Sequence, residues 1–163
     1  MRISCTALWL PKEGNTNEEY EDAVYPSEAV THDEIEQFKC AVADGATETS
    51  FAGLWARLLV QGYATEQLDL AKLKEEWNEQ TKGKDLAWYA EEKLESGAFA
   101  ALVGLIVTNE KHWEAEAVGD SCLIHTRGKE LLLSFPLKKS DEFNNSPALL
   151  SSTQAAEAPP TEK

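Results

Sequence analysis

The feature that most constrains the fold is a short apolar run, FAALVGLIV, at residues 99–107. The run is shorter than a typical helix and has no polar stripe, which favours a strand covered on both faces. A sheet built around such a strand needs a second covering layer. The fold must therefore place helices or another sheet against each side.

Helical spacing precedes this run. Residues 50–63 carry one continuous apolar stripe, and Thr49 or Ser50 is the expected N-cap. A second helix is predicted after Thr65 and a third over about residues 85–95. The inward positions are Phe51, Leu54, Trp55, Leu58, Leu59 and Gly62 in the first helix, and Leu70, Leu73 and Trp77 in the second.

Extended patterns flank the helices on both sides. The predicted strands are residues 2–10, 21–25, 38–43, 99–107, 113–118, 122–126 and 129–135. Turn signals at Gly119-Asp120 and Arg127-Gly128 separate the last three and favour an antiparallel meander. The order of strands, helices and strands indicates an α+β domain over residues 1–152. Residues 153–163 have the composition of a disordered polar tail.

The charge balance excludes some partners. Fifteen basic residues stand against 29 acidic ones, a net charge of −14, so neither nucleic acid nor an anionic membrane is an expected partner. No apolar segment approaches the length of a membrane helix, and the N-terminus does not resemble a signal peptide. Three widely spaced cysteines without a CxxC pair fit free thiols in a reducing compartment, so a cytoplasmic location is expected.

Three short acidic motifs carry the chemistry: Glu21-Asp22-Ala23, Asp44-Gly45 and Gly119-Asp120-Ser121. Each lies where an extended segment meets a turn. Carboxylates at strand ends can converge on Mg²⁺ or Mn²⁺, and such a site suits attack on a phosphate ester. Asp44 can bridge two cations, while Gly45 can bring its carbonyl close to one. Taken singly, each motif also fits a plain turn or a solvated acidic surface.

Other sites have weaker support. Ser121 as a nucleophile would need a histidine base, and His125 is poorly placed four residues later in a strand. His32 and His112 have no ligand-like neighbours. Adjacent acids on an extended segment point to opposite sides, so at most one of Glu21 and Asp22 would bind a metal directly.

In their order, these motifs resemble the type-2C metal-dependent protein phosphatases, in their bacterial branch. The resemblance spans roughly residues 2–152. It rests on Glu21-Asp22-Ala23, AVADGATETSFAGLWARLLV at 41–60, EAVGDSCLIHTRGKEL at 116–131 and SFPLKKSDEFNNSPALLSS at 134–152. It implies an antiparallel β-sandwich flanked by helices, in α-β-β-α layers, and a two-metal Mg²⁺ or Mn²⁺ centre. The implied activity is hydrolysis of phosphoserine or phosphothreonine proteins by metal-activated water.

The resemblance also implies roles for individual residues. Asp44 would bridge two metals, Gly45 would offer its carbonyl, and Glu21 would bind one metal. Asp22 would hydrogen-bond the metal-bound water, which makes Asp22 and Asp44 the expected catalytic residues. Asp120 matches an acid that helps to hold an additional metal.

Two departures from the family pattern limit the expected site. Asn17 occupies the place of the phosphate-binding arginine, and Arg2 and Lys12 are the candidate replacements. The later Ser-Asp-Gly and Asp-Asn motifs are absent from the 163 residues, and Ser140-Asp141-Glu142 lacks the glycine. We therefore expect a partial metal site and an incomplete sandwich whose C-terminal part is missing. The alternative expectation is a non-catalytic phosphatase-like domain that binds a protein, for example through an exposed sheet edge.

Overall fold

The computed structural model describes residues 1–163 except 12, 15, 17–19, 48, 50, 66–67, 84–93, 95, 111 and 154–155. It is a mixed α+β fold in which two helices pack on a mainly antiparallel five-stranded sheet, with two small sheets beside it. The elements are β1 (Ile3–Cys5), β2 (Ala23–Tyr25), β3 (Val30–His32), β4 (Gln37–Gly45), α1 (Ala52–Thr65), α2 (Leu70–Thr81), β5 (Phe99–Thr108), β6 (Trp113–Val118), β7 (Leu123–Arg127), β8 (Glu130–Phe135) and β9 (Leu150–Ser151). A 3-10 turn, Ser140–Glu142, follows β8.

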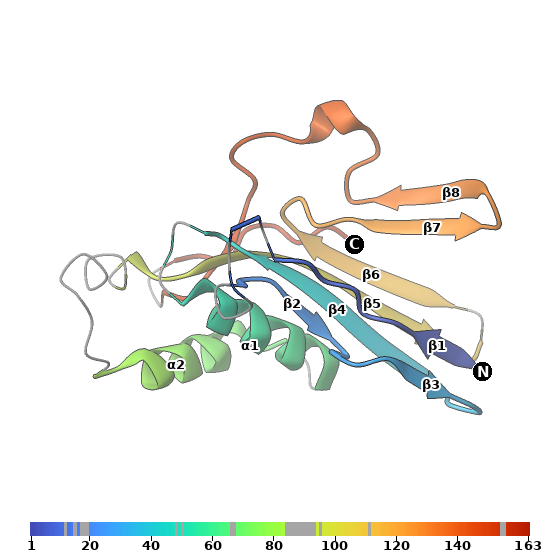
Figure 1. The fold of residues 1–163 in the computed structure, drawn as a ribbon, viewed down its shortest axis with the longest axis horizontal. Coiled ribbons are helices and arrows are strands. Elements are labelled where there is room, and N and C mark those ends of the chain that lie inside the picture. Colours follow the sequence, from blue (N-terminus) through green and yellow to red (C-terminus); the bar gives the residue numbers. More distant parts are fainter. Residues whose placement is uncertain are drawn as a thin grey trace.

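The five-stranded sheet has the order β2-β4-β5-β6, and the short strand β9 also pairs with β5. Strands β4 and β5 run antiparallel over their whole length, from Gln37 opposite Thr108 to Gly45 opposite Ala100. The apolar run at 99–107 is therefore the middle of the sheet, as its composition predicts. Figure 1 shows these strands as long ribbons lying side by side, with the helices on one side of the sheet.

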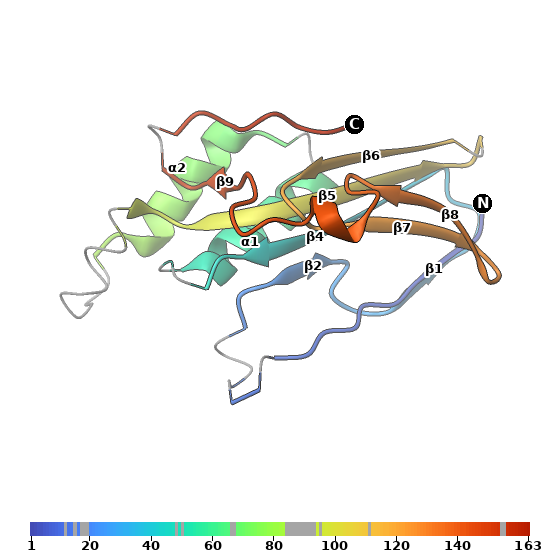
Figure 2. The same ribbon diagram turned by 90° about the horizontal axis from the view of Figure 1, so that it is seen from above.

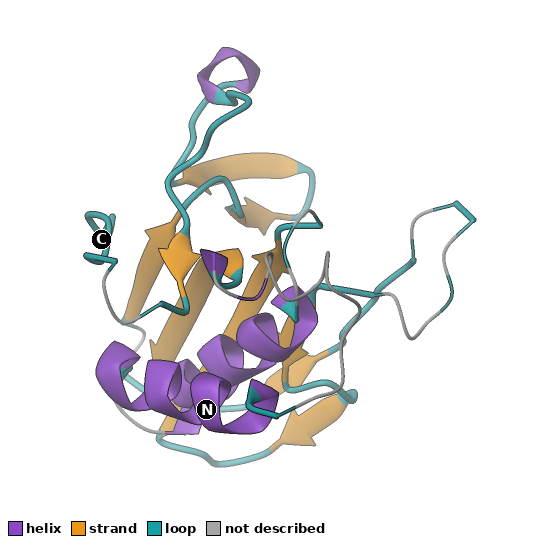
Figure 3. Cartoon of the chain, turned by 90° about the vertical axis from the view of Figure 1, so that its left-hand side faces the viewer, coloured by secondary structure: helices purple, strands orange, loops and turns teal. Residues whose placement is uncertain are grey.

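The helix side of the sheet is a closed core. Trp55 and Leu59 of α1 and Trp77 of α2 are buried there, and the two helices lie side by side against the strands (Figure 3). The Trp55 indole Nε1 donates a hydrogen bond to the Leu150 carbonyl oxygen at 2.9 Å, which ties α1 to β9. The Tyr63 ring lies where a side chain on Gly104 would project. The predicted inward stripes of both helices therefore face this core.

The helix starts differ from one another. Asp69 caps α2, because its carboxylate accepts hydrogen bonds from the backbone N–H groups of Ala71 and Lys72. The Thr49 hydroxyl, a predicted cap of α1, instead donates a hydrogen bond to the Ala46 carbonyl oxygen at 2.8 Å. It therefore stabilises the turn before α1. The other predicted cap, Ser50, lies outside the described residues.

The opposite side of the sheet carries the β7–β8 hairpin (Figures 1 and 2). The predicted meander is wrong at one point, since β7 and β8 form a separate two-stranded sheet instead of continuing from β6. The chain leaves the sheet at Gly119, whose φ is +95°. A Cβ there would lie 2.7 Å from the Ala101 Cβ, so the turn needs glycine. The Trp113 and His125 rings meet edge to face at 6.0 Å and hold the hairpin over β6.

Other predictions differ in extent. The first strand covers Ile3–Cys5 rather than residues 2–10, and the third helix, predicted over 85–95, falls almost wholly outside the described residues. In the segment predicted as a disordered tail, Glu162 exchanges backbone hydrogen bonds with Ala117 of β6. The Lys163 ammonium contacts the Glu116 carboxylate of the same strand at 2.7 Å. Cys5, Cys40 and Cys122 are free thiols. Among the described residues, no helix combines the length and apolarity needed to cross a bilayer.

Candidate functional site

Strand register brings two of the three acidic motifs together. Strands β2 and β4 are antiparallel, with Ala23 opposite Ala43. Continuing this register by one residue places Asp22 beside Asp44. Paired residues of antiparallel strands project to the same face, so both carboxylates belong to the sheet face that the helices do not cover. Asp44 is exposed and Asp22 is half-buried there.

The backbone beside these acids is tightly packed. A Cβ on Gly45 would collide with the Glu21 carbonyl oxygen and would lie 3.2 Å from the Ala52 Cβ. Glycine at 45 therefore lets the Glu21 backbone, the end of β4 and the start of α1 approach one another. This packing explains the glycine without a metal, and the predicted carbonyl ligand at Gly45 stays a prediction.

Tyr20 links the two carboxylates electrostatically. Its hydroxyl hydrogen-bonds the Asp22 side chain, and the Tyr20 ring lies 5.4 Å from the Trp9 ring. Burial raises the pKa of Tyr20, and the charges of Asp22 and Asp44 raise it further. The phenol therefore stays protonated beside the Asp22 carboxylate.

Asp120 lies apart from this pair. Asp44 is opposite Ala101 of β5, and continuing the β5–β6 register from Leu102 and Val118 places Gly119 across from Ala101. Two strand spacings, about 10 Å, therefore separate the β4 end from the turn that carries Asp120. The Asp120 carbonyl oxygen accepts a hydrogen bond from the Cys122 thiol. The accessory metal role of Asp120 stays a prediction.

The fit to a metal ion is partial. Within the described part of the chain, no group of three or more His, Cys, Asp or Glu side chains is placed to hold a metal. Asp22 and Asp44 can offer carboxylate oxygens at one strand end, and the Glu21 side chain is half-buried next to them. Mg²⁺ takes six oxygen ligands and retains water readily, so two carboxylates suit one weakly held cation.

The candidate replacements for the phosphate-binding arginine fall elsewhere. Arg2 forms an exposed ion pair with Asp33 at 3.2 Å, where β1 begins. Lys12 and Asn17 lie outside the described residues. Ser140-Asp141-Glu142 is an exposed 3-10 turn.

Sequence reasoning missed a cation beside the acids. Arg57 of α1 lines a cavity of about 420 Å³ together with Asp22 and Tyr20. The signal was available in the sequence, because Arg57 is the single charged residue of AGLWARLLVQGYAT, the segment that forms α1. The apolar stripe of this helix accounts for its inward residues and does not include the exposed Arg57.

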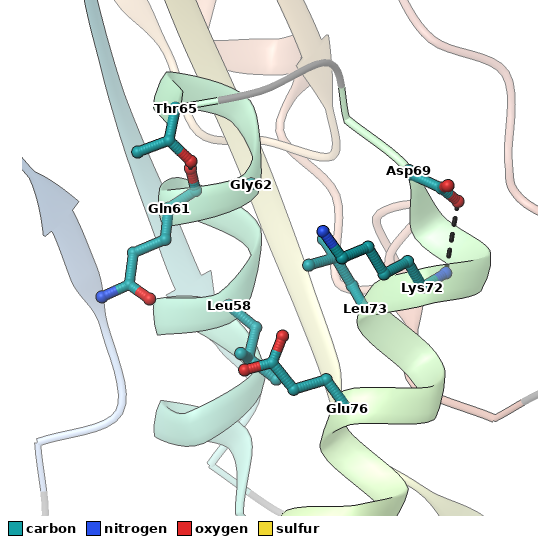
Figure 4. A pocket seen from close by; sticks show the side chains of 8 residues that line it. All are labelled: Leu58, Gln61, Gly62, Thr65, Asp69, Lys72, Leu73 and Glu76. Carbon is teal, nitrogen blue, oxygen red and sulfur yellow. Dashed lines mark hydrogen bonds between the residues drawn. The ribbon is translucent and has the colours of Figure 1, made fainter.

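A second hollow, of about 140 Å³, lies between α1 and α2. Figure 4 shows Leu58 and Leu73 between the helices, with the polar residues Asp69, Lys72 and Glu76 along α2. The dashed line marks the capping hydrogen bond from the Lys72 backbone to Asp69. This hollow is small, and its carboxylate at Asp69 already serves the helix, so it is a groove of helix packing.

Comparisons of the chain with protein-family models, with curated proteins and with solved structures found no match. The resemblance to type-2C phosphatases therefore rests on the motifs alone. The structure adds an independent observation, which is the pairing of two of those motifs at one strand end.

Proposed function

We propose that the chain is a type-2C-like metal-dependent protein serine/threonine phosphatase domain with a partial metal site. The observation that supports this proposal is the pairing of Asp22 with Asp44 on one face, next to the close contact of Glu21 with Gly45. In this proposal the five-stranded sheet is one layer of an α-β-β-α sandwich. The small sheets β1–β3 and β7–β8 belong to the second layer.

The two aspartates have different roles at the proposed site. Asp44 is exposed and supplies the carboxylate that a cation reaches from solvent. Asp22, which lies beside the Tyr20 hydroxyl, accepts hydrogen bonds from water and orients it. A bound Mg²⁺ or Mn²⁺ would supply charge neutralisation for a phosphoryl group and would lower the pKa of water.

Metal binding tests this proposal directly. Titration with Mn²⁺, followed by electron paramagnetic resonance, should detect one weak site with a Kd on the order of millimolar, because Asp44 supplies a carboxylate and water fills most of the other ligand positions. Asp44→Asn should remove that site. Asp141→Asn is the matched control, since it deletes one exposed carboxylate in the 3-10 turn away from the sheet. Equal Mn²⁺ binding by the wild type and Asp44→Asn would contradict the proposed site.

Activity measures how complete the site is. With Mn²⁺ and an aryl phosphate, the 163-residue chain should hydrolyse substrate very slowly, because the remaining metal ligands of the family are not among its residues. A substantial rate that Asp44→Asn abolishes would show that the site is complete after all.

A second function is a non-catalytic phosphatase-like domain that binds a protein. Two observations favour it: no group of three metal-binding side chains occurs among the described residues, and Val42, in the middle of the sheet, is 45 % exposed. The Mn²⁺ titration separates the two functions. A chain that binds no Mn²⁺ and hydrolyses no phosphate ester would support the binding domain.

A further inference from the structure

A cavity of about 420 Å³ lies at the outer edge of β2, immediately beside the paired carboxylates. Its walls come from α1, from β2 and from the N-terminal segment before β2. It combines one cation, one carboxylate, small polar groups and aromatic rings, which is the composition of a binding site for an amphipathic anion. The residues that matter here are Arg57, Asp22, Gln61, Ser27, Trp9 and Tyr20.

Arg57 is fixed near the acidic motif by the start of α1. A Cβ on Gly53 would lie 3.0 Å from the Tyr20 carbonyl oxygen, 3.3 Å from the Glu21 Cα and 3.4 Å from the Arg57 Nη1. The guanidinium therefore lies beside the backbone that leads to Asp22. Arg57 lines the cavity and forms no ion pair with a carboxylate among the residues that the structure describes.

Part of the cavity wall is aromatic. The rings of Trp9 and Tyr20 are tilted by 41° with centroids 5.4 Å apart, and Trp9 is 50 % exposed. A half-exposed indole offers a flat apolar surface to a ligand. The cavity thus combines a guanidinium with the aromatic surface of Trp9.

We propose that this cavity binds a phosphorylated peptide side chain, with the phosphate on Arg57 and a neighbouring apolar side chain on Trp9. This inference rests on the proposed function, because it assigns the phosphate-capturing cation of that site. The chain carries a net charge of −14, and Asp22 and Asp44 repel a phosphate dianion. A guanidinium is the side chain best suited to offset that repulsion, since it can donate two parallel hydrogen bonds to phosphate oxygens.

Calorimetric binding of a phosphoserine peptide with a flanking Phe tests this inference, with EDTA present so that no metal takes part. The wild type should bind it weakly and should bind the unphosphorylated peptide at least about 10-fold less well. Arg57→Gln should lose roughly 10-fold in affinity, and Arg57→Lys should retain part of it. Arg127→Gln is the matched control, because it removes the same charge from an exposed position at the end of β7. Trp9→Ala should weaken the Phe-flanked peptide and leave an Ala-flanked one unchanged.

The outcomes separate this inference from the proposed function. Binding that depends on Arg57 in a chain that binds no Mn²⁺ and hydrolyses no phosphate ester would keep the inference and overturn the phosphatase. Hydrolysis with an unchanged KM in Arg57→Gln would keep the phosphatase and overturn the inference. Absence of phosphopeptide binding by the wild type, or equal losses in Arg57→Gln and Arg127→Gln, would also overturn it. Far-ultraviolet circular dichroism of each variant checks that the fold is retained.

Discussion

The two faces of the five-stranded sheet are built differently. Two helices cover the part of one face that holds the core, and Trp55 there is 0 % exposed. The other face is covered over β5 and β6, where Val103 is 8 % exposed, but it is open over β4, where the neighbouring Val42 is 45 % exposed. The first face thus packs against a buried core, while the second face has a covered half and an open half.

The open half coincides with the candidate site. Asp44 follows Val42 by two residues on the same strand and the same face, so the carboxylate lies at the end of the uncovered strip. Helix packing secures the backbone of the site through Gly45 and Ala52, while the carboxylates remain accessible. The helix core and the paired carboxylates thus belong to opposite faces, which mutations can separate.

Replacing one tryptophan on each face should give the largest difference. Trp55→Ala removes a fully buried ring and its hydrogen bond to Leu150, so it should lower the free energy of unfolding by about 3–5 kcal/mol. Trp113→Ala removes a ring that is 36 % exposed on the other face and should cost about 1–2 kcal/mol. Urea denaturation followed by circular dichroism measures both values. Equal losses would show that the second face contributes as much as the helix core.

Tyr63 provides a smaller test of the helix face. Its hydroxyl is buried without a hydrogen-bond partner among the described residues, and its ring packs on Gly104. Tyr63→Phe removes an unsatisfied group and keeps the ring, so it should stabilise the protein by about 1 kcal/mol. Destabilisation by Tyr63→Phe in urea denaturation would mean that the hydroxyl has a partner.

The same residue gives a pH dependence. Burial, and then the charge of Glu116, raises the pKa of Tyr63 to about 12 from the usual value of 10. The folded state therefore holds the phenol proton more tightly than the unfolded state does. The resulting stabilisation is complete below about pH 10 and is lost as the pH rises through about 12. Tyr63→Phe should lose less stability than the wild type over this range, which thermal unfolding across the range would measure.

The fold was predictable from the sequence where a single pattern of apolar residues dominates a segment. The stripe at 51–62 and the apolar run at 99–107 gave α1 and β5, because burial on one side of a helix or on both faces of a strand leaves a clear pattern. The break between β6 and β7 was not predictable, since Gly119-Asp120 fits a hairpin equally well. The path of the chain after β6 depends on the close approach of Gly119 to Ala101, a residue of β5 that is distant in sequence.

The candidate site was predictable only in part. Acidic residues at predicted strand ends indicated Asp22 and Asp44, but their pairing depends on the β2–β4 register. Arg57 was missed because helical periodicity explained its neighbours completely and gave no reason to place one exposed charge next to Tyr20. Strand order likewise decides that Asp120 lies two strands away from Asp44.

Val42 and Val103 provide the smallest and most local test, because they are register partners on one face of adjacent strands. Val→Thr keeps the shape and adds one hydroxyl. In Val42→Thr the hydroxyl reaches water, so the free energy of unfolding should change by less than about 0.5 kcal/mol. In Val103→Thr it is buried under the covered half and should cost about 1–2 kcal/mol. Urea denaturation of both variants measures the difference. A loss at Val42 as large as that at Val103 would show that something covers β4 in solution, and the strip next to Asp44 would then not be open.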